Sequence, residues 1–335
     1  MRILFVTHHW YNNSHHSKYS GFQRIVYFAS QKNDVTVVTW GKKSEKYVEE
    51  ENGVNVIIVK PFVNNPIINR IIISLQARKI QDSFDVVHAL YSDCTYFLKK
   101  NTYVVTFHVL PSIVKHKSIK SLIFLYIKYL LIQKRSLKFA NKIVCVSNNI
   151  VQIISKLRKD VYFIPHGIDT TYWNVNEADL KLKKKNMVLC VGSHGVNYNQ
   201  LSEIINVNTI YEFHLVGMKD YPYNHKNCKK YSRISDEELK QLYRDAFFMV
   251  RPVYFATANN SLLEAMSMGC IIITNKLPGI LDYLDNNSCI FIDDLNNFKI
   301  DENFNYDNIR NNAFKKIRNL YSWDKVFEAY ENVYH

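Results

Sequence analysis

Short runs of valine, isoleucine and leucine recur along this chain, each separated from the next by a longer amphipathic stretch. The runs are mostly continuous rather than strictly alternating, which is the pattern of parallel strands buried on both faces. Alternation of such strands with helical segments predicts right-handed crossovers and a doubly wound α/β sheet. The runs are 2–7, 34–39, 54–59, 85–90, 103–108 and 142–147 in the first half, and 187–192, 212–217, 247–252, 270–274 and 289–292 in the second.

These runs form two sets, and a polar, lysine-rich segment separates them. A chain of 335 residues is too long for one ordinary core and suits two domains. We therefore expect two Rossmann-like, doubly wound domains that face a central cleft. The expected boundaries are an N-terminal domain at 1–172, a linker at 173–186, a C-terminal domain at 187–320 and a last helix at 321–335.

Composition narrows the class of protein further. Hydrophobic residues make up 47% of the chain and charged residues 22%, which describes a globular protein. The sequence has no signal-peptide pattern and no run of 18 apolar residues, so we expect a cytoplasmic protein without a transmembrane helix. The six cysteines have no paired spacing and four lie in apolar runs, which indicates reduced core thiols.

The formal net charge of +13 predicts an acidic partner: nucleic acid, an anionic membrane or a phosphorylated small molecule. Nucleic acid is the least favoured, because zinc-finger spacing, an RNP-type motif and a basic recognition helix are all absent from the sequence. Residues 115–139 are both apolar and basic. They predict a helix that either packs on the N-terminal sheet or lies on an anionic membrane surface.

Ligands of doubly wound sheets bind beyond the carboxyl ends of the strands, and the stretch 247–274 is the most informative of these places. We expect Asn260 to cap a helix that ends at Gly269, leaving the N–H groups of residues 261–263 for an anion. Glu264 lies one turn in, where its carboxylate can accept hydrogen bonds from a ribose diol. The alternative is that Asn260 only caps the helix and Glu264 only complements its dipole.

Residues 247–274 resemble the donor-site signature of the retaining glycosyltransferases of family 4. That signature consists of a Glu, seven further residues and a second Glu, which lies in a helix of the LLEAM type. "SLLEAMSMGCIII" places Glu264 at the second acidic position, whereas Ala256 stands at the first. Other segments resemble the family in order and spacing, namely 140–147, 161–173, 235–252 and 321–334. The resemblance implies the GT-B fold, a metal-independent transfer with retention, and a closing helix that crosses back onto the N-terminal domain.

Three contacts that the family usually makes with the donor are altered here. In the family the first Glu contacts the sugar, so at Ala256 the neighbouring Asn259–Asn260 pair would have to supply neutral hydrogen bonds. The Arg and Lys that usually bind the diphosphate are absent after Gly192, and His194 and Arg251 are the nearest candidate cations. The alternative for Arg251 is an ion pair that holds the loop.

Several histidines follow N-terminal strands. His108 resembles a family histidine beside the transferred sugar, where it would hydrogen-bond a hydroxyl or stabilise charge as the phosphate leaves. His88 either faces the acceptor or supports the residues that contact the ligand, and His166 is expected to be structural. Residues 15–17 lie in the loop after the first strand. This loop either faces the acceptor or phosphate, is solvated, or forms a zinc site. Adjacent histidines chelate poorly, so we expect no metal.

These features predict a glycosyltransferase that moves a sugar from a nucleotide-sugar to a hydroxyl of a glycan or lipid-linked glycan, in cell-surface polysaccharide biosynthesis. It would act in the cytoplasm, either free or peripheral on the inner face of the membrane, with no cofactor besides the nucleotide-sugar co-substrate. The alternatives are a non-catalytic nucleotide-sugar or glycan-binding relative and a peripheral membrane-binding protein. The expected site residues are catalytic His108, donor-binding Gly21, Ser193, His194, Arg251, Asn259, Asn260, Ser261, Leu262 and Glu264, and acceptor-binding His15, His16, Ser17 and His88.

Overall fold

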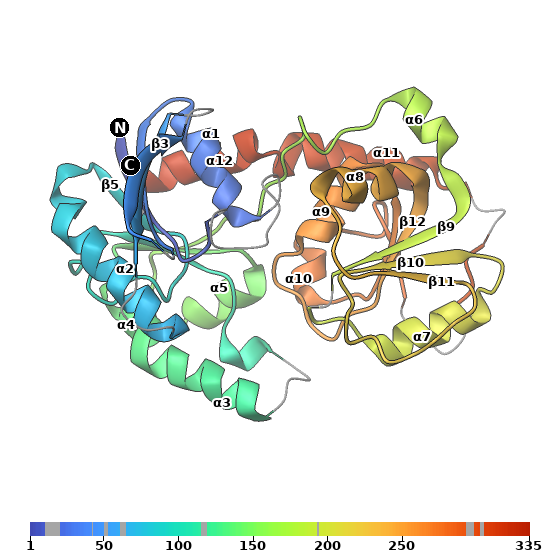
Figure 1. Ribbon diagram of the computed structural model, residues 1–335, viewed down its shortest axis with the longest axis horizontal. Coiled ribbons are helices and arrows are strands. Elements are labelled where there is room, and N and C mark those ends of the chain that lie inside the picture. The colour runs from blue at the N-terminus through green and yellow to red at the C-terminus, as the bar shows by residue number, and fades with distance from the viewer. Residues whose placement is uncertain are drawn as a thin grey trace. The chain divides into compact units, whose positions relative to one another are not determined.

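The computed structural model describes residues 1–10, 21–41, 43–49, 53–60, 65–114, 119–192, 194–292, 298–301 and 305–335 (Figure 1). The chain divides into two compact units. Unit 1 comprises Met1–Gly167 together with Trp323–His335, and unit 2 comprises Ile168–Ser322. Each unit has its own largely parallel sheet with helices between the strands, so the predicted pair of doubly wound α/β sheets is confirmed.

Unit 1 is built on a sheet whose described strands run in the order β3-β4-β2-β1-β5-β6-β7-β8. Among these, only β3 and β4 pair antiparallel, at one edge of the sheet. Buried, mostly apolar side chains lie on both faces of the central strands, as the continuous apolar runs predict. The strands are β1 (Arg2–Val6), β2 (Asp34–Trp40), β3 (Glu45–Glu49), β4 (Val54–Val59), β5 (Val86–Ala89), β6 (Val104–Phe107), β7 (Lys142–Cys145) and β8 (Val161–Phe163).

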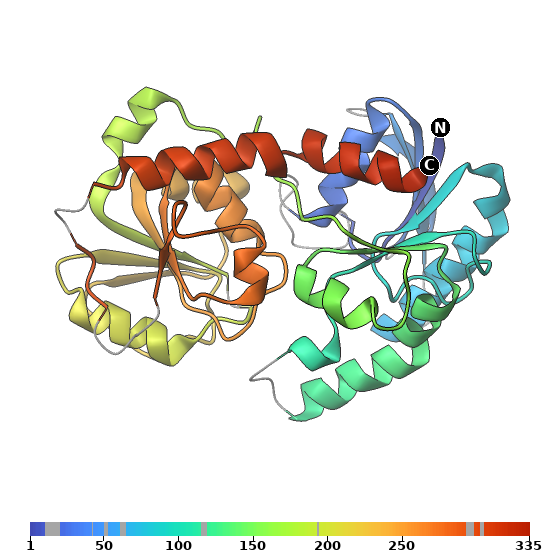
Figure 2. The ribbon, with the colours of Figure 1, turned by 180° about the vertical axis from the view of Figure 1, so that it is seen from behind.

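Helices cover both faces of this sheet. Helix α1 packs beside α12 on one face, as the two views of the ribbon show (Figure 2). Ile3 and Phe5 of β1 belong to the same buried core as residues of these two helices. Within the described residues, no helix of the chain is both long and apolar enough to cross a bilayer. The helices of unit 1 are α1 (Ile25–Ser30), α2 (Pro66–Ile80), α3 (Ile119–Lys128), α4 (Lys134–Phe139), α5 (Asn148–Ile154) and α12 (Trp323–Tyr334), with 3₁₀ turns at Phe22–Arg24, Gln81–Ser83 and Pro111–Ile113 and a π-helical turn at Tyr129–Gln133.

Unit 2 repeats this plan with described strands in the order β11-β10-β9-β12-β13-β14, all parallel. Its strands are β9 (Lys184–Val191), β10 (Glu212–Val216), β11 (Cys228–Tyr231), β12 (Ala246–Arg251), β13 (Ile271–Thr274) and β14 (Ile290–Phe291). Its helices are α6 (Glu177–Leu182), α7 (Tyr198–Val207), α8 (Asp236–Asp245), α9 (Asn260–Ser267), α10 (Pro278–Leu281) and α11 (Asp307–Lys316), with a π-helical turn at Ile317–Tyr321.

The expected linker at 173–186 belongs instead to unit 2, where α6 and the first residues of β9 occupy it. The reason lies in Lys183, a buried residue of the lysine-rich run. Its Nζ donates to the carbonyls of Tyr243 at 2.7 Å and Ala246 at 2.8 Å, and so satisfies the backbone at the end of α8. A run that looks solvated in sequence therefore contains a structural lysine.

His88 on β5 fixes α12 to the sheet of unit 1. The side chain is fully buried, with Nδ1 2.8 Å from the Tyr334 hydroxyl and Nε2 2.8 Å from the Thr106 hydroxyl. The ring also packs against Tyr330, with the centroids 5.3 Å apart. Both ring nitrogens are engaged inside unit 1, so the prediction that His88 contacts an acceptor is wrong. Burial lowers the pKa of His88 to about 3.

We predict that acid destabilises the fold through His88. The folded pKa of about 3 lies below the ordinary value of 6.5. Stability is therefore full above pH 6.5 and declines as the unfolded state takes up a proton, down to about pH 3. At pH 5 the loss is about 2 kcal/mol. Urea unfolding at pH 7 and pH 5 checks this, because His88→Gln retains a donor and an acceptor but does not titrate. An equal pH effect in both proteins would contradict the assignment.

Candidate functional site

The carboxyl edge of the unit 2 sheet is closed by two loops that pair with each other. The loop after β9 and the loop after β12 form a bridge between Val196 and Val253. The N–H of Tyr254 donates to the Gly195 carbonyl at 2.9 Å. Gly195 has φ +73°, and a Cβ there would lie 2.9 Å from the Phe255 carbonyl oxygen, so only glycine fits. This pairing holds the ends of the two central strands in one rigid edge.

Arg251 lies beneath this edge and is 5% exposed. Its Nη1 donates to the carbonyls of Val191 and Gly192, and its Nη2 donates to the His194 carbonyl at 3.0 Å. Burial is the main cause that lowers the pKa of Arg251, to about 10. The guanidinium thus holds the loop through carbonyl oxygens, whereas we expected a diphosphate contact or an ion pair.

The imidazole of His194 is on the surface, since the residue is exposed. Its ring lies edge-on to Phe255 with the centroids 5.4 Å apart. Ser193, the other residue expected in this loop to bind the donor, lies outside the described residues.

Helix α9 begins at this edge, one residue earlier than the sequence predicts. Asn259 is the N-cap residue, and its Oδ1 accepts a hydrogen bond from the Ser261 hydroxyl at 2.7 Å rather than from a backbone N–H. The N–H groups of Leu262 and Leu263 both donate to the Asn259 carbonyl, so the prediction that they are open to an anion is wrong. Gly269 ends the helix at φ +70°, as predicted.

Glu264 lies inside the first turns of α9 and is 4% exposed. The Tyr243 hydroxyl lies 2.9 Å from Glu264 Oε2 and 3.2 Å from the Ser261 carbonyl. Burial and the nearby carboxylate raise the pKa of Tyr243 well above its usual value, so the phenol stays a donor. Tyr243 thereby orients the carboxylate. The sequence alone does not single out this residue, because a tyrosine on an amphipathic helix is usually only part of the core.

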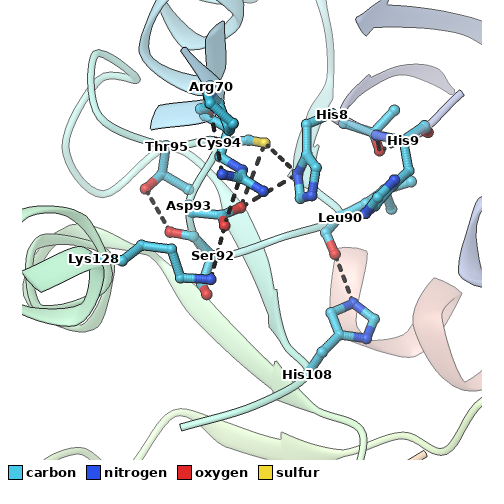
Figure 3. Close-up of polar contacts among 12 residues, drawn as sticks. His8, His9, Arg70, Leu90, Ser92, Asp93, Cys94, Thr95, His108 and Lys128 are labelled. Atoms are coloured by element: carbon cyan, nitrogen blue, oxygen red, sulfur yellow. Dashed lines mark hydrogen bonds and ion pairs between the residues drawn. The ribbon is translucent and has the colours of Figure 1, made fainter. Parts of the chain in front are cut away.

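Unit 1 carries a second polar group of residues at the carboxyl ends of β1 and β5, with Asp93 at its centre (Figure 3). Arg70 Nε and Lys128 Nζ each lie 3.2 Å from Asp93 Oδ2. His8 Nδ1 lies 3.4 Å from the other oxygen and 3.3 Å from Cys94 Sγ. Burial raises the pKa of Asp93, but His8, Lys128 and Arg70 outweigh it and hold that pKa well below its usual range.

The nearby atoms of His8, Asp93 and Cys94 lie within 4.8 Å of one another, which is close enough to share a metal ion. Lys128 and Arg70 already balance the carboxylate, and a divalent cation would add to an excess of positive charge. The arrangement therefore suits an anionic ligand better than a metal. The sequence offers one signal for these residues, since position 8 follows the predicted strand 2–7 and positions 93–94 lie in the loop after the predicted strand 85–90.

His108 also lies at this edge. Its Nε2 donates to the Leu90 carbonyl at 2.8 Å, so its Nδ1 must accept, and His166 Nε2 lies 3.1 Å from it. Burial is the main cause that lowers the pKa of His108 well below its usual value. Both nitrogens are bound within unit 1, which differs from the predicted contact with a sugar. His166, expected to be structural, orients His108.

The remaining predicted residues lie around the first helix. Gly21 has φ +94° and accepts the Arg24 N–H through its carbonyl, which starts the turn before α1. His15, His16 and Ser17 lie outside the described residues. The structure thus brings those expected unit 2 residues that it describes to one edge of a sheet, and it gives His88 and Arg251 other partners.

We predict that Arg251→Met lowers the free energy of unfolding by about 2–3 kcal/mol, because three buried or partly buried carbonyls lose a charged donor. Arg233→Met is the matched control. Arg233 is exposed, and a surface change of this kind shifts stability by less than about 0.5 kcal/mol. Urea unfolding monitored by circular dichroism measures both variants. Equal stability of Arg251→Met and wild type would show that the guanidinium does not hold the loop.

Two family models match the sequence. Residues 4–172 match the model described as Glycosyltransferase Family 4, and residues 185–299 match the model described as Glycosyl transferases group 1. No curated protein matches the chain.

Solved structures resemble the chain over nearly its whole length. Sucrose-phosphate synthase from Thermosynechococcus elongatus has a TM-score of 0.74 at 13% identity, covering 99% of this chain and 98% of its own. HepE from Anabaena, in complex with UDP and glucose, has a TM-score of 0.69 at 12% identity with the same coverage. WaaG, a glycosyltransferase involved in lipopolysaccharide biosynthesis, has a TM-score of 0.61 at 14% identity, covering 98% and 95%. Family matches and shared fold together lead to one conclusion: the chain belongs to glycosyltransferase family 4 and has the GT-B fold.

Proposed function

We propose that this protein transfers a sugar from a nucleotide-sugar to a hydroxyl acceptor, with retention at the anomeric carbon and without a divalent cation. The observation that carries this proposal is Glu264, a buried carboxylate that Tyr243 orients at the carboxyl edge of unit 2. Its position in the family motif suits a ribose diol. The solved complex of HepE with UDP and glucose supports a nucleotide-sugar as donor.

In the proposed step the acceptor oxygen forms a bond to the anomeric carbon as the bond from that carbon to the diphosphate breaks. The acceptor proton passes to the leaving phosphate oxygen on the same face, so no protein nucleophile is needed. The leaving group gathers negative charge. The N–H groups of Leu262 and Leu263 are already used, so the positive partners are the dipole at the amino end of α9 and the exposed imidazole of His194. Arg251 assists indirectly, because it holds the loop that carries His194.

The experiment that tests this proposal compares Glu264→Ala with the exposed control Glu237→Gln. A thermal-shift screen of UDP-, GDP- and ADP-sugars identifies the donor, and titration then gives its affinity. Loss of two hydrogen bonds to a charged acceptor, each worth about 1.5–3 kcal/mol, should weaken donor binding tenfold or more in Glu264→Ala. Nucleotide release on adding acceptor, measured with EDTA present, then reports the transfer.

The two readouts separate the possible outcomes. Wild-type affinity in a folded Glu264→Ala protein would exclude the ribose contact. Donor binding without nucleotide release, over a panel of glycan and lipid-linked acceptors, would favour a non-catalytic relative instead. Activity that EDTA abolishes would contradict a metal-independent step.

We further propose that the acceptor is a lipid-linked glycan of a cell-surface polysaccharide, reached from an anionic membrane surface. The support is α3 and the turn after it, where seven large apolar side chains are between 44% and 77% exposed: Ile119, Ile123, Phe124, Tyr126, Ile127, Leu130 and Leu131. Within the described side chains of α3 none is buried, whereas Ile132 and Leu137, later in the predicted segment 115–139, are buried. The core-packing alternative therefore holds for the second half of that segment and not for α3. Lysines in the same segment suit anionic headgroups.

We predict that the double variant Ile123→Glu, Ile127→Glu loses at least tenfold in binding to vesicles of phosphatidylglycerol and phosphatidylcholine. Each apolar side chain moved out of water contributes about 1.5–3 kcal/mol, and the added charges repel the lipid. Co-sedimentation measures the bound fraction. Leu157→Glu is the matched control, because Leu157 is 66% exposed on another part of unit 1. Equal sedimentation of all three proteins would exclude α3 as the contact.

A further inference from the structure

A cavity of about 1000 Å³ opens at the amino ends of the unit 2 strands, the opposite edge of that sheet from Glu264. Its walls come from α6, the starts of β9 and β12, the residues just before β10 and the start of α11. All of these belong to unit 2, so the cavity is a property of that unit alone. The nucleotide-sugar site proposed above does not use it.

Positive charge dominates the walls of this cavity. Lys181 and Lys185 are exposed there, and within the described residues neither forms an ion pair. Arg310 contributes a guanidinium from α11, and its carboxylate partner among the described residues is Asp307 at 3.1 Å. Glu177 is the other acidic residue of the wall. Cations from three separate elements thus converge on one space, which suits a dianion better than a single carboxylate.

Arg310 has one unsatisfied group. The residue is 8% exposed, its Nε donates to the Gly269 carbonyl at 3.1 Å and its Nη1 to Asp307. Its Nη2 has no hydrogen-bond partner among the described residues. A buried guanidinium nitrogen without a partner is costly, so it indicates a ligand that completes it.

Another part of the wall is apolar, although Lys183, Asn186 and Asn305 also line the cavity. Ile210 is 67% exposed at the rim, and Leu180 and the ring of Phe247 line the interior. The Arg310 guanidinium stacks on Phe247, 4.7 Å from the ring centroid. A ligand for this cavity therefore needs an apolar body as well as an anionic group.

Two wall residues connect the cavity to the helices that hold Glu264. Arg310 binds the carbonyl of Gly269, the residue that ends α9. Lys183 binds the carbonyl of Tyr243, whose hydroxyl orients Glu264. A ligand that tightens either contact would therefore stabilise the carboxyl edge as well.

We propose that this cavity is a second ligand site, which binds a small organic phosphate with an apolar body and is separate from the nucleotide-sugar site. The phosphate contacts Lys181, Lys185 and Nη2 of Arg310, and the apolar body lies against Leu180, Ile210 and Phe247. Binding there does not depend on the proposed transfer reaction, so either proposal can fail without the other.

Phenyl phosphate is the probe, because it carries both features that the cavity recognises. Inorganic phosphate lacks the apolar body and benzyl alcohol lacks the charge, so both should bind at least tenfold more weakly. Isothermal titration at constant ionic strength compares the three compounds on the wild-type chain. Equal affinity for phenyl phosphate and inorganic phosphate, or no binding of phenyl phosphate, would overturn the proposal.

Variants then locate the bound probe. The double variant Lys181→Gln, Lys185→Gln changes only exposed side chains, so it should fold normally and lose at least tenfold in affinity. Arg310→Met tests the unsatisfied nitrogen, with a melting curve to check the fold. Lys184→Gln is the matched control, since Lys184 lies in the same basic run but pairs with Asp245 at 2.9 Å. Unchanged affinity in the double variant would place the probe elsewhere and exclude this site.

Discussion

Burial of parallel strands on both faces is the constraint on which the rest of this structure depends. Strands such as β1 and β9 use their backbone groups for their neighbours and their side chains for the two covering layers of helices. Polar chemistry can then gather only where the strands end. The residues of interest in each unit, Asp93 in one and Glu264 in the other, lie at or just after such ends.

The continuous apolar runs were therefore a sound guide to the two sheets. They could not reveal β3 and β11, since each lies at the edge of its sheet and has a mostly polar sequence. They also could not show that Lys183 is buried, because a lysine that binds three backbone carbonyls looks in sequence like any solvated lysine. The pattern of apolar residues in a short stretch indicates whether a strand is buried. It does not reveal the contacts of Lys183, which join positions some 60 residues apart.

The site was predictable to the extent that the motif is local. Glu264 and Gly269 lie where the sequence places them on α9. Partners from other elements were not predictable: Tyr334 and Thr106 engage His88, and the backbone of the loop after β9 engages Arg251. The sequence does not distinguish an exposed histidine from a buried one whose two ring nitrogens are both hydrogen-bonded. Only the fold separates them.

The altered donor motif has a physical consequence. In the proposed transfer the leaving diphosphate is stabilised by groups other than the usual Arg and Lys. Arg251 does not contact it directly in this proposal, because its guanidinium is buried and bound to backbone carbonyls. Its charge instead makes the loop beside α9 rigid. A transition state is stabilised best by hydrogen-bond donors and dipoles that are already in position and need not reorganise.

The central claim is that the carboxyl edge of unit 2, around Glu264, takes the nucleotide-sugar. Hydrogen–deuterium exchange with a mixture of UDP-, GDP- and ADP-sugars tests this most directly, because protection of the edge is visible whichever base the donor carries. Our account predicts slower exchange in the peptides that cover 191–198 and 254–264, and no change in β11. Protection confined to other segments, or none at all, would contradict it.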